Sequence, residues 1–168
     1  MDLYILRHGE AIKKIRIGMT DYSRPLTVAG KKDIQNVSKF LKNKKIKFQH
    51  IFCSPLTRSI QTTNIVTPFL NFVNKVKFVE LEDLMPEGNI VNVCQTLSKL
   101  NPNSNVLIIG HNPLLVKMIS SIISNSKFPI ETNIRLKTSG LAKIRINSFS
   151  PKISGELRWL LTPNTMNS

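Results

Sequence analysis

Short apolar runs alternate along the chain with stretches in which apolar residues recur every three or four positions. Four runs have the length and continuous hydrophobicity of strands buried on both faces: 3–6, 50–53, 76–79 and 106–109. After each run the periodicity is helical, which predicts helices at 27–41, 56–70, 90–100 and 114–123. This alternation predicts an α/β fold, a three-layer αβα sandwich with a mostly parallel central sheet.

Two further apolar runs, 141–146 and 156–161, follow a loop around residues 124–140. They are expected to be strands that join the sheet as an added edge or hairpin. No repeat or linker divides the chain. We therefore expect a single domain at residues 1–163 and a loose C-terminal tail at 164–168.

The compartment is indicated by what the sequence lacks. Residues 1–6 do not have the pattern of a signal peptide, and the longest apolar stretch, 114–123, is far too short to cross a bilayer. Cys53 and Cys94 lie in unrelated segments without metal-ligand spacing, which suits a reducing compartment. The expected protein is soluble and cytoplasmic, with no membrane partner.

The formal net charge of +14 is compatible with a nucleic-acid partner or with attraction of anionic substrates. The lysines are scattered and are not interleaved with aromatic residues, as a base-stacking surface requires. A solvated basic face is therefore the favoured interpretation. Steering of an anionic partner remains the alternative, and nucleic acid is disfavoured.

Residues suited to phosphate chemistry follow three of the predicted strands. Arg7, His8 and Gly9 come after the first, Arg58 follows the second, and His111 follows the fourth. Because ligands of open α/β sheets bind beyond the carboxyl ends of the strands, these residues are expected to meet there. An arginine beside a histidine is often structural, but the coincidence at three matching junctions favours a site.

The same junctions carry helix-start signals. Ser54 is expected to cap a helix that begins at Pro55, and Asn112 to cap one that begins at Pro113. Arg58 then lies in the first helical turn, beside free backbone N–H groups that attract anions. Arginine forks suit the paired oxygens of a phosphoryl group.

At these residues the sequence resembles the histidine phosphatase superfamily, in its phosphoglycerate mutase-like branch, whose hallmark is Arg-His-Gly after the first strand. The shorter SixA-type phosphohistidine phosphatases are most similar. Beyond 7–9, the resemblance rests on three groups of residues: Arg24, Pro25, Leu26, Thr27 and Gly30; Ser54, Pro55, Arg58, Gln61 and Thr62; Gly110 and His111.

The resemblance implies that His8 is the phosphorylated nucleophile and that Arg7, Arg58 and His111 form the phosphate pocket, with Gly9 beside them. Mutase-like relatives carry further phosphate ligands at two positions that are Ala11 and Lys14 here. Arg24 is the candidate to compensate; the alternative is a plain surface arginine.

Larger relatives also supply a Glu as general acid after the third strand. Asp83 aligns best by its distance to Pro86 and Gly88, and Glu82 is second. The alternative is that these carboxylates are solvated or capping groups.

His8 must attack as neutral imidazole, and its cationic neighbours disfavour protonation. Its other ring nitrogen is expected to donate to a backbone carbonyl near Gly9. No metal or cofactor is expected, because His8, His50 and His111 are dispersed along the chain and fixed arginines can stabilise the charge. His50 opens an apolar strand and is expected to be structural.

Since an imidazole leaving group needs little acid assistance, a phosphohistidine-bearing signalling protein is the expected substrate. The chain also has no room between residues 66 and 89 for a large cap over the site. The alternatives are a small-metabolite phosphomonoesterase and a non-enzymatic basic protein that binds anions or nucleic acid.

Overall fold

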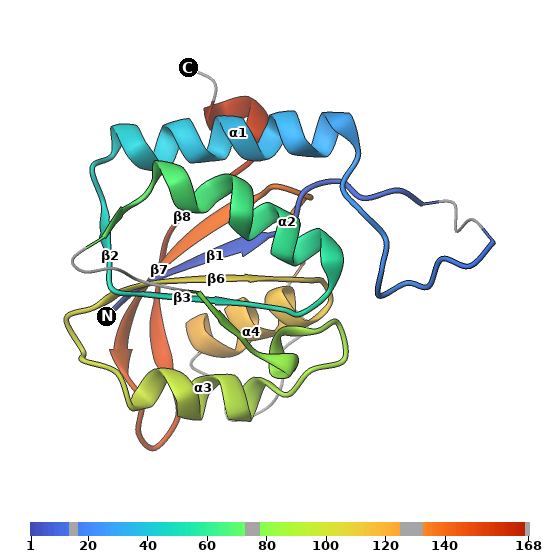
Figure 1. The fold of residues 1–168 in the computed structure, drawn as a ribbon. Helices are drawn as coiled ribbons and strands as arrows, with labels where there is room; N and C mark the ends of the chain where they lie inside the picture. Colours follow the sequence, from blue (N-terminus) through green and yellow to red (C-terminus); the bar gives the residue numbers. More distant parts are fainter. Residues whose placement is uncertain (14–16, 73–77, 125–132, 167–168) are drawn as a thin grey trace.

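The computed structural model describes residues 1–13, 17–72, 78–124 and 133–166, and a six-stranded sheet forms its centre (Figure 1). The strand order is β5-β3-β6-β1-β7-β8. The bounds are β1 Asp2–Arg7, β3 His50–Cys53, β5 Val79–Glu80, β6 Asn105–Gly110, β7 Leu141–Ser148 and β8 Ser154–Leu161. The first four strands in this order are parallel, whereas β7 and β8 are antiparallel additions at one edge. The mostly parallel sheet with an added C-terminal hairpin is confirmed.

Helices cover both faces of the sheet (Figure 1). Their bounds are α1 Val28–Asn43, α2 Thr57–Val66, α3 Ile90–Ser98 and α4 Leu114–Ile123. Leu3 and Ile5 of β1 belong to the core cluster under α3 and α4, and Tyr4 and Leu6 to the cluster under α1 and α2. Because side chains alternate between the faces of a strand, both faces of β1 must be apolar, which explains its continuous hydrophobic run. The three-layer sandwich is therefore confirmed.

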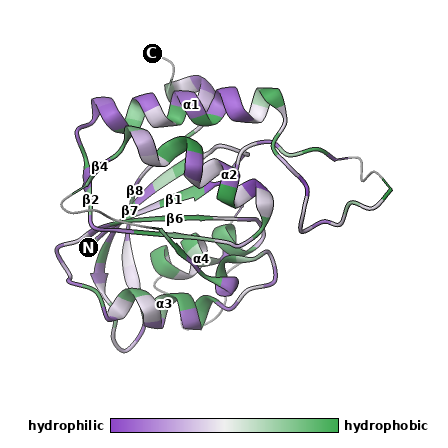
Figure 2. Cartoon of the chain, in the orientation of Figure 1, coloured by the Kyte–Doolittle hydropathy of each residue, from purple (hydrophilic) through white to green (hydrophobic). Residues whose placement is uncertain are grey.

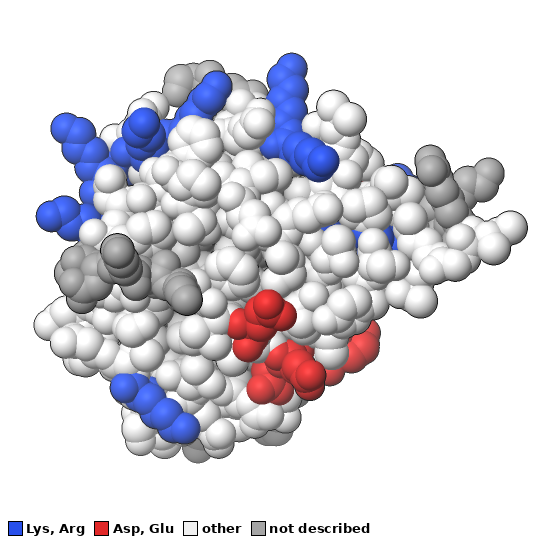
Figure 3. All heavy atoms as spheres, viewed as in Figure 1, with Lys and Arg blue, Asp and Glu red and all other residues white. Residues whose placement is uncertain are grey.

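The two outer layers differ in polarity. Figure 2 shows that α4 is largely hydrophobic, whereas α1 carries many hydrophilic residues. In Figure 3 basic side chains gather over α1, apart from a smaller group of acidic ones. Exposed lysines of α1 include Lys31, Lys32, Lys39 and Lys42. No helix within the described ranges is long and apolar enough to span a membrane.

The predicted helices differ from the observed ones mainly at their ends. Thr27 is the N-cap of α1, with its hydroxyl accepting from the Gly30 N–H at 2.9 Å. The predicted helix at 56–70 becomes α2 followed by a 3₁₀ turn, η1 (Thr67–Phe69). Pro68 explains this break, because proline has no N–H to continue the α-helical pattern.

Two short strands, β2 (Lys47–Phe48) and β4 (Asn71–Phe72), form a separate parallel pair that the sequence did not predict. Two residues are too few to show any periodicity. Residues 76 and 77 of the strand predicted at 76–79 lie outside the described residues, and β5 begins at its last position, Val79.

The first residues of the expected C-terminal tail are ordered, which corrects that expectation. Pro163–Met166 form a 3₁₀ turn, η3, and Met166 is buried in the cluster under α1. An apolar side chain in the final turn gives the segment a packing site, so it does not extend into solvent as a polar tail would.

Candidate active site

The ends of β1, β3 and β6 bring the residues singled out from the sequence to one cavity of about 520 Å³. Its walls include Arg7, His8, Arg24, Arg58 and His111. The parallel pairing of β1 and β3 with the central strand β6 produces this meeting, since all three strands end at the same sheet edge.

The backbone around His8 is fixed on both sides. The His8 N–H donates to the Gly110 carbonyl at 3.1 Å, and the His8 carbonyl accepts from the Ser139 N–H at 3.1 Å. The His8 side chain Nδ1 lies 2.6 Å from the Gly9 carbonyl oxygen. That carbonyl can only accept, so Nδ1 donates, and the bond expected from the sequence is present. A neutral His8 then keeps its lone pair on Nε2.

Burial and neighbouring charges keep His8 neutral. The residue is 8% exposed. Burial first, and then the charges of Arg58, Arg7 and Arg24, lower the pKa of His8 to about 4, although the bond to Gly9 acts in the opposite direction. At neutral pH the imidazole is therefore uncharged and able to act as a nucleophile.

Close backbone contacts hold the turn after His8. A Cβ on Gly9 would lie 2.9 Å from the Gly30 carbonyl oxygen, and a Cβ on Gly30 would overlap the Glu10 backbone. The Gly9 N–H also donates to the Thr62 hydroxyl at 3.1 Å. Gly30 and Thr62, two residues of the family pattern, thus pin α1 and α2 to the turn that carries the nucleophile.

Arg7, which is half-buried, and Arg58, which is buried, each retain a donor without a partner among the described residues. Arg7 Nη1 donates to the Leu136 carbonyl at 2.9 Å, and Arg58 donates from Nη1 to the Asp21 carbonyl at 2.8 Å and from Nη2 to its carboxylate at 3.1 Å. The Nε atoms of Arg7 and Arg58 are buried and have no hydrogen-bond partner among the described residues. Unpaired cationic donors in a cavity suit an anionic ligand.

His111 lies against His8, with 4.7 Å between the ring centroids. Its Nε2 is 2.8 Å from the Ser54 hydroxyl and 3.1 Å from that of Ser59. Its Nδ1 is buried and has no partner in the described part of the chain. Burial, followed by His8 and the nearby arginines, lowers the pKa of His111, so this ring is neutral as well.

The contact with His111 corrects the expected role of Ser54. The helix begins at Thr57 and has no side-chain cap. The Ser54 hydroxyl accepts from the Leu56 N–H at 3.3 Å and also lies within hydrogen-bond distance of His111 Nε2. The backbone of Leu56 is extended, so the helix begins two residues later than the start at Pro55 that the Ser-Pro pair predicted.

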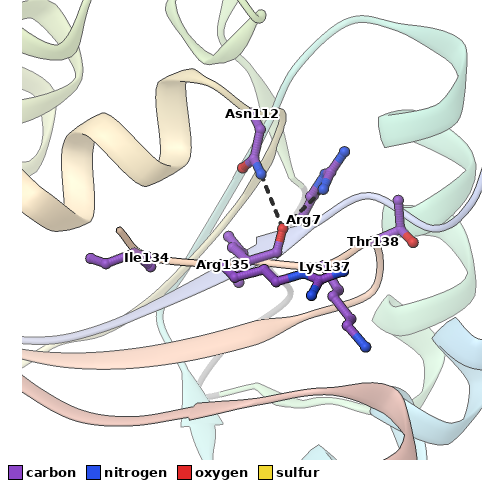
Figure 4. Close-up of a pocket in the computed structure, with 7 residues that line it drawn as sticks. Arg7, Asn112, Ile134, Arg135, Lys137 and Thr138 are labelled. Atoms are coloured by element: carbon purple, nitrogen blue, oxygen red, sulfur yellow. Dashed lines mark hydrogen bonds between the residues drawn. The ribbon is translucent and has the colours of Figure 1, made fainter. Parts of the chain in front are cut away.

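Asn112 is not a helix cap either. The helix α4 starts at Leu114 without a side-chain cap. The Asn112 side-chain amide instead donates to the Leu136 carbonyl at 3.0 Å, the same oxygen that accepts from Arg7 (Figure 4). This bond draws the side chain away from the free N–H groups of the first helical turn.

Arg24 lies in the cavity wall, where its Nε donates to Asp21 at 2.7 Å and its Nη1 donates to the Ile12 carbonyl at 2.8 Å. Contact between Arg24 and phosphate stays a prediction. Ala11 also lines the cavity, and Lys14 lies outside the described residues.

The candidate acids do not line this cavity. Glu82 and Asp83 lie in the 3₁₀ turn η2 (Glu82–Leu84), where Asp83 accepts from the Asn92 amide at 3.0 Å. The carboxylates in the wall are Glu10 and Asp21, which sequence reasoning missed. Glu10 had a signal, since it directly follows Arg-His-Gly, whereas Asp21 lies in a segment without periodicity.

The remaining histidine and the cysteines lie apart from the cavity wall. His50 is half-buried and stacks on Phe52 at 6.3 Å between ring centroids. Burial raises the pKa of both Cys53 and Cys94 to about 11, which disfavours the reactive thiolate form of each. Across the described ranges, no three His, Cys, Asp or Glu side chains are grouped to hold a metal ion.

Known proteins are similar to this chain both in sequence and in fold. The family model of the histidine phosphatase superfamily (branch 1) matches residues 3–85. The phosphohistidine phosphatase SixA of Escherichia coli (strain K12) is 27% identical over 165 residues, which cover 97% of this chain and 94% of that protein. The mitochondrial serine/threonine-protein phosphatase PGAM5 of Xenopus tropicalis is 31% identical over 86 residues, covering 51% of this chain and 28% of that protein.

The solved structure of the protein histidine phosphatase SixA complexed with tungstate superimposes with a TM-score of 0.82 at 26% identity, covering 99% of both chains. The similarity therefore includes the C-terminal half that the family model leaves unmatched. With the Arg-His-Gly strand end, the second arginine and the second histidine on one cavity, the chain is similar to the histidine phosphatase superfamily in sequence, fold and arrangement of the site.

Proposed function

We propose that this protein is a phosphohistidine phosphatase that works through a phosphorylated His8 and without a metal ion. The observation that carries the proposal is the tautomer of His8. Its Nδ1 donates to the Gly9 carbonyl, which leaves the Nε2 lone pair of a buried, neutral ring available in a cationic cavity.

The reaction has two steps. His8 Nε2 attacks phosphorus, the bond from phosphorus to the substrate nitrogen breaks, and that nitrogen keeps the electron pair, so that the substrate side chain leaves as a neutral imidazole. Water then attacks phosphorus, the bond from phosphorus to Nε2 breaks and its electron pair returns to the ring, and inorganic phosphate leaves with the protons of the water. The guanidinium groups of Arg7 and Arg58, with His111, stabilise charge on the phosphoryl oxygens in both steps.

The position of the carboxylates favours a P–N substrate. Alkoxide leaving groups need a proton donor, whereas an imidazole is a stable neutral or cationic leaving group. Asp83 and Glu82 lie outside the cavity wall. Of the two carboxylates in the wall, Glu10 accepts from the Thr27 hydroxyl. Asp21 is paired with Arg24 and Arg58, and this arrangement suits a leaving group that depends little on an acid. The names of the SixA relatives agree, and tungstate, bound in one of them, is a tetrahedral oxyanion like phosphate.

We further propose that the substrate is a cytoplasmic signalling protein that carries phosphohistidine, and that residues 1–163 act as one domain. Two free cysteines suit a reducing compartment. Both core clusters pack on the same sheet, which supports the single domain.

The test is incubation with ³²P-labelled phosphohistidine in the presence of a chelator. Wild type releases phosphate and acquires acid-labile, base-stable label, whereas His8→Ala does neither. His50→Ala is the matched control, since this histidine lies outside the cavity. Activity that disappears with the chelator, or fast hydrolysis of sugar phosphates without hydrolysis of phosphohistidine, would contradict the proposal.

A further inference from the structure

A second cavity, of about 400 Å³, adjoins the catalytic one (Figure 4). The two share Arg7, Asn112 and Thr138 in their walls. The second cavity is otherwise lined by residues 134–137, and none of its lining residues within the described ranges is an Asp or Glu. A ligand whose phosphoryl group occupies the first cavity therefore has a neighbouring space within reach.

The segment that lines the second cavity is hydrogen-bonded to residues of the active site. The Leu136 carbonyl accepts from Arg7 and from Asn112, and the Leu136 side chain is 1% exposed. Downstream, the Gly140 N–H donates to the Lys137 carbonyl at 2.9 Å, and the Ser139 N–H bonds His8. The backbone on both sides of residue 137 is thus held in a defined position beside the active site.

Two cationic side chains project from this held segment. Arg135 and Lys137 are exposed on either side of the buried Leu136. Neither side chain forms a hydrogen bond or an ion pair with any described residue, in contrast to Arg24 and Arg58, which are both paired with Asp21. Unpaired cations on a fixed backbone are available to an anionic partner, and binding them does not require ordering of the backbone.

We propose that the second cavity binds an acidic side chain of the substrate protein, an Asp or Glu next to the phosphohistidine, through Arg135 and Lys137. The inference rests on the proposed function, because it assigns a recognition site to the same reaction. An arginine fork matches a carboxylate, and Ile134 offers an apolar contact for the methylene stem. The site selects among phosphoproteins by the charge beside the phosphorylated histidine.

The test compares two phosphohistidine peptides that differ only in acidic or amide residues beside the phosphorylated histidine. Three proteins are measured: wild type, Arg135→Glu with Lys137→Glu, and Lys39→Glu with Lys42→Glu. The last is a control with the same charge change, on exposed lysines near the end of α1 remote from the active-site turn. The measured quantity is kcat/KM at low and high salt.

Wild type is expected to prefer the acidic peptide, and the preference should shrink at high salt. Reversing both charges should lower kcat/KM on the acidic peptide by roughly tenfold more than on the amide peptide. The control should retain the wild-type preference. Equal losses on the two peptides, or no preference in wild type, would overturn the inference, as would an equal effect of the control.

If the protein is not a phosphohistidine phosphatase, the experiment gives a result that differs from failure of the recognition site. If wild type hydrolyses neither phosphohistidine peptide, the same comparison is made with acidic and neutral phosphoserine peptides, and p-nitrophenyl phosphate reports that each variant is folded. A preference for the acidic flank that is lost in the double variant would then still support the recognition site. No preference there would overturn it.

Discussion

At the scale of single residues, the site depends on two neutral imidazole rings, His8 and His111, whose orientations are fixed by different kinds of group. His8 is fixed by a backbone carbonyl, whereas His111 is fixed by the hydroxyls of Ser54 and Ser59. The sequence predicted both histidines, because they follow strand ends. It did not predict the serine contacts, since Ser54 also fits a helix-start signal and Ser59 has no local signal at all.

Ser54→Ala should lower kcat about tenfold with little effect on KM, because His111 loses its shorter contact and is less well oriented. Ser38→Ala is the matched control. Ser38 is an equally buried serine that bonds the Ile34 carbonyl within α1, far from the chemistry. Both changes should cost about 1 kcal/mol of stability, but only the first should affect turnover. Equal kcat values for the two variants would contradict the role of Ser54.

The lowered pKa of His8 also predicts a pH dependence of folding. The unfolded chain protonates His8 near pH 6.5, whereas the folded protein does so near pH 4. The contribution to stability is therefore complete above pH 6.5 and is lost as the pH falls toward 4. Between pH 6.5 and 5, urea unfolding of wild type should lose about 2 kcal/mol more than that of His8→Gln. If the free energies of unfolding of wild type and His8→Gln changed equally with pH, the pKa of His8 would not be lowered by folding.

At the scale of elements, strand ends were easier to predict than helix ends. The buried runs of β1, β3 and β6 placed Arg7, His8 and His111 at one sheet edge, as the structure has them. The start of a helix depends on whether a nearby polar side chain bonds to the helix or to another group. The Asn112 amide donates to the Leu136 carbonyl, which is distant in the sequence, and does not cap its own helix. Such competition between local and long-range partners is invisible to local patterns.

Gly30→Ala tests the packing of α1 on the active-site turn. Alanine normally stabilises a helix relative to glycine, by about 1 kcal/mol. Here the new Cβ would overlap the backbone of Glu10, which cannot move without shifting the turn after His8. We expect a net loss of about 2 kcal/mol in urea unfolding, together with reduced activity. Gln35→Ala, at an exposed position of the same helix, should be harmless. A stabilised Gly30→Ala would disprove the close packing.

At the scale of the whole molecule, the fold separates a basic outer helix layer from a cationic cavity at the sheet edge. The net charge of +14 does not indicate the function, because the exposed lysines of α1 and the arginines of the site contribute to it equally. What distinguishes the two sets is burial: Arg58 is 3% exposed. Burial depends on tertiary packing, which composition does not report.

The most direct test of the account is to locate the phosphoryl group on the enzyme. Wild type is mixed with phosphohistidine substrate, quenched in alkali within milliseconds, digested, and examined by mass spectrometry and ³¹P NMR. Because Nδ1 of His8 donates to the Gly9 carbonyl, the account predicts phosphate on His8 at Nε2. Phosphate on His111, phosphate on Nδ1 of His8, or turnover without any phosphorylated histidine would contradict it.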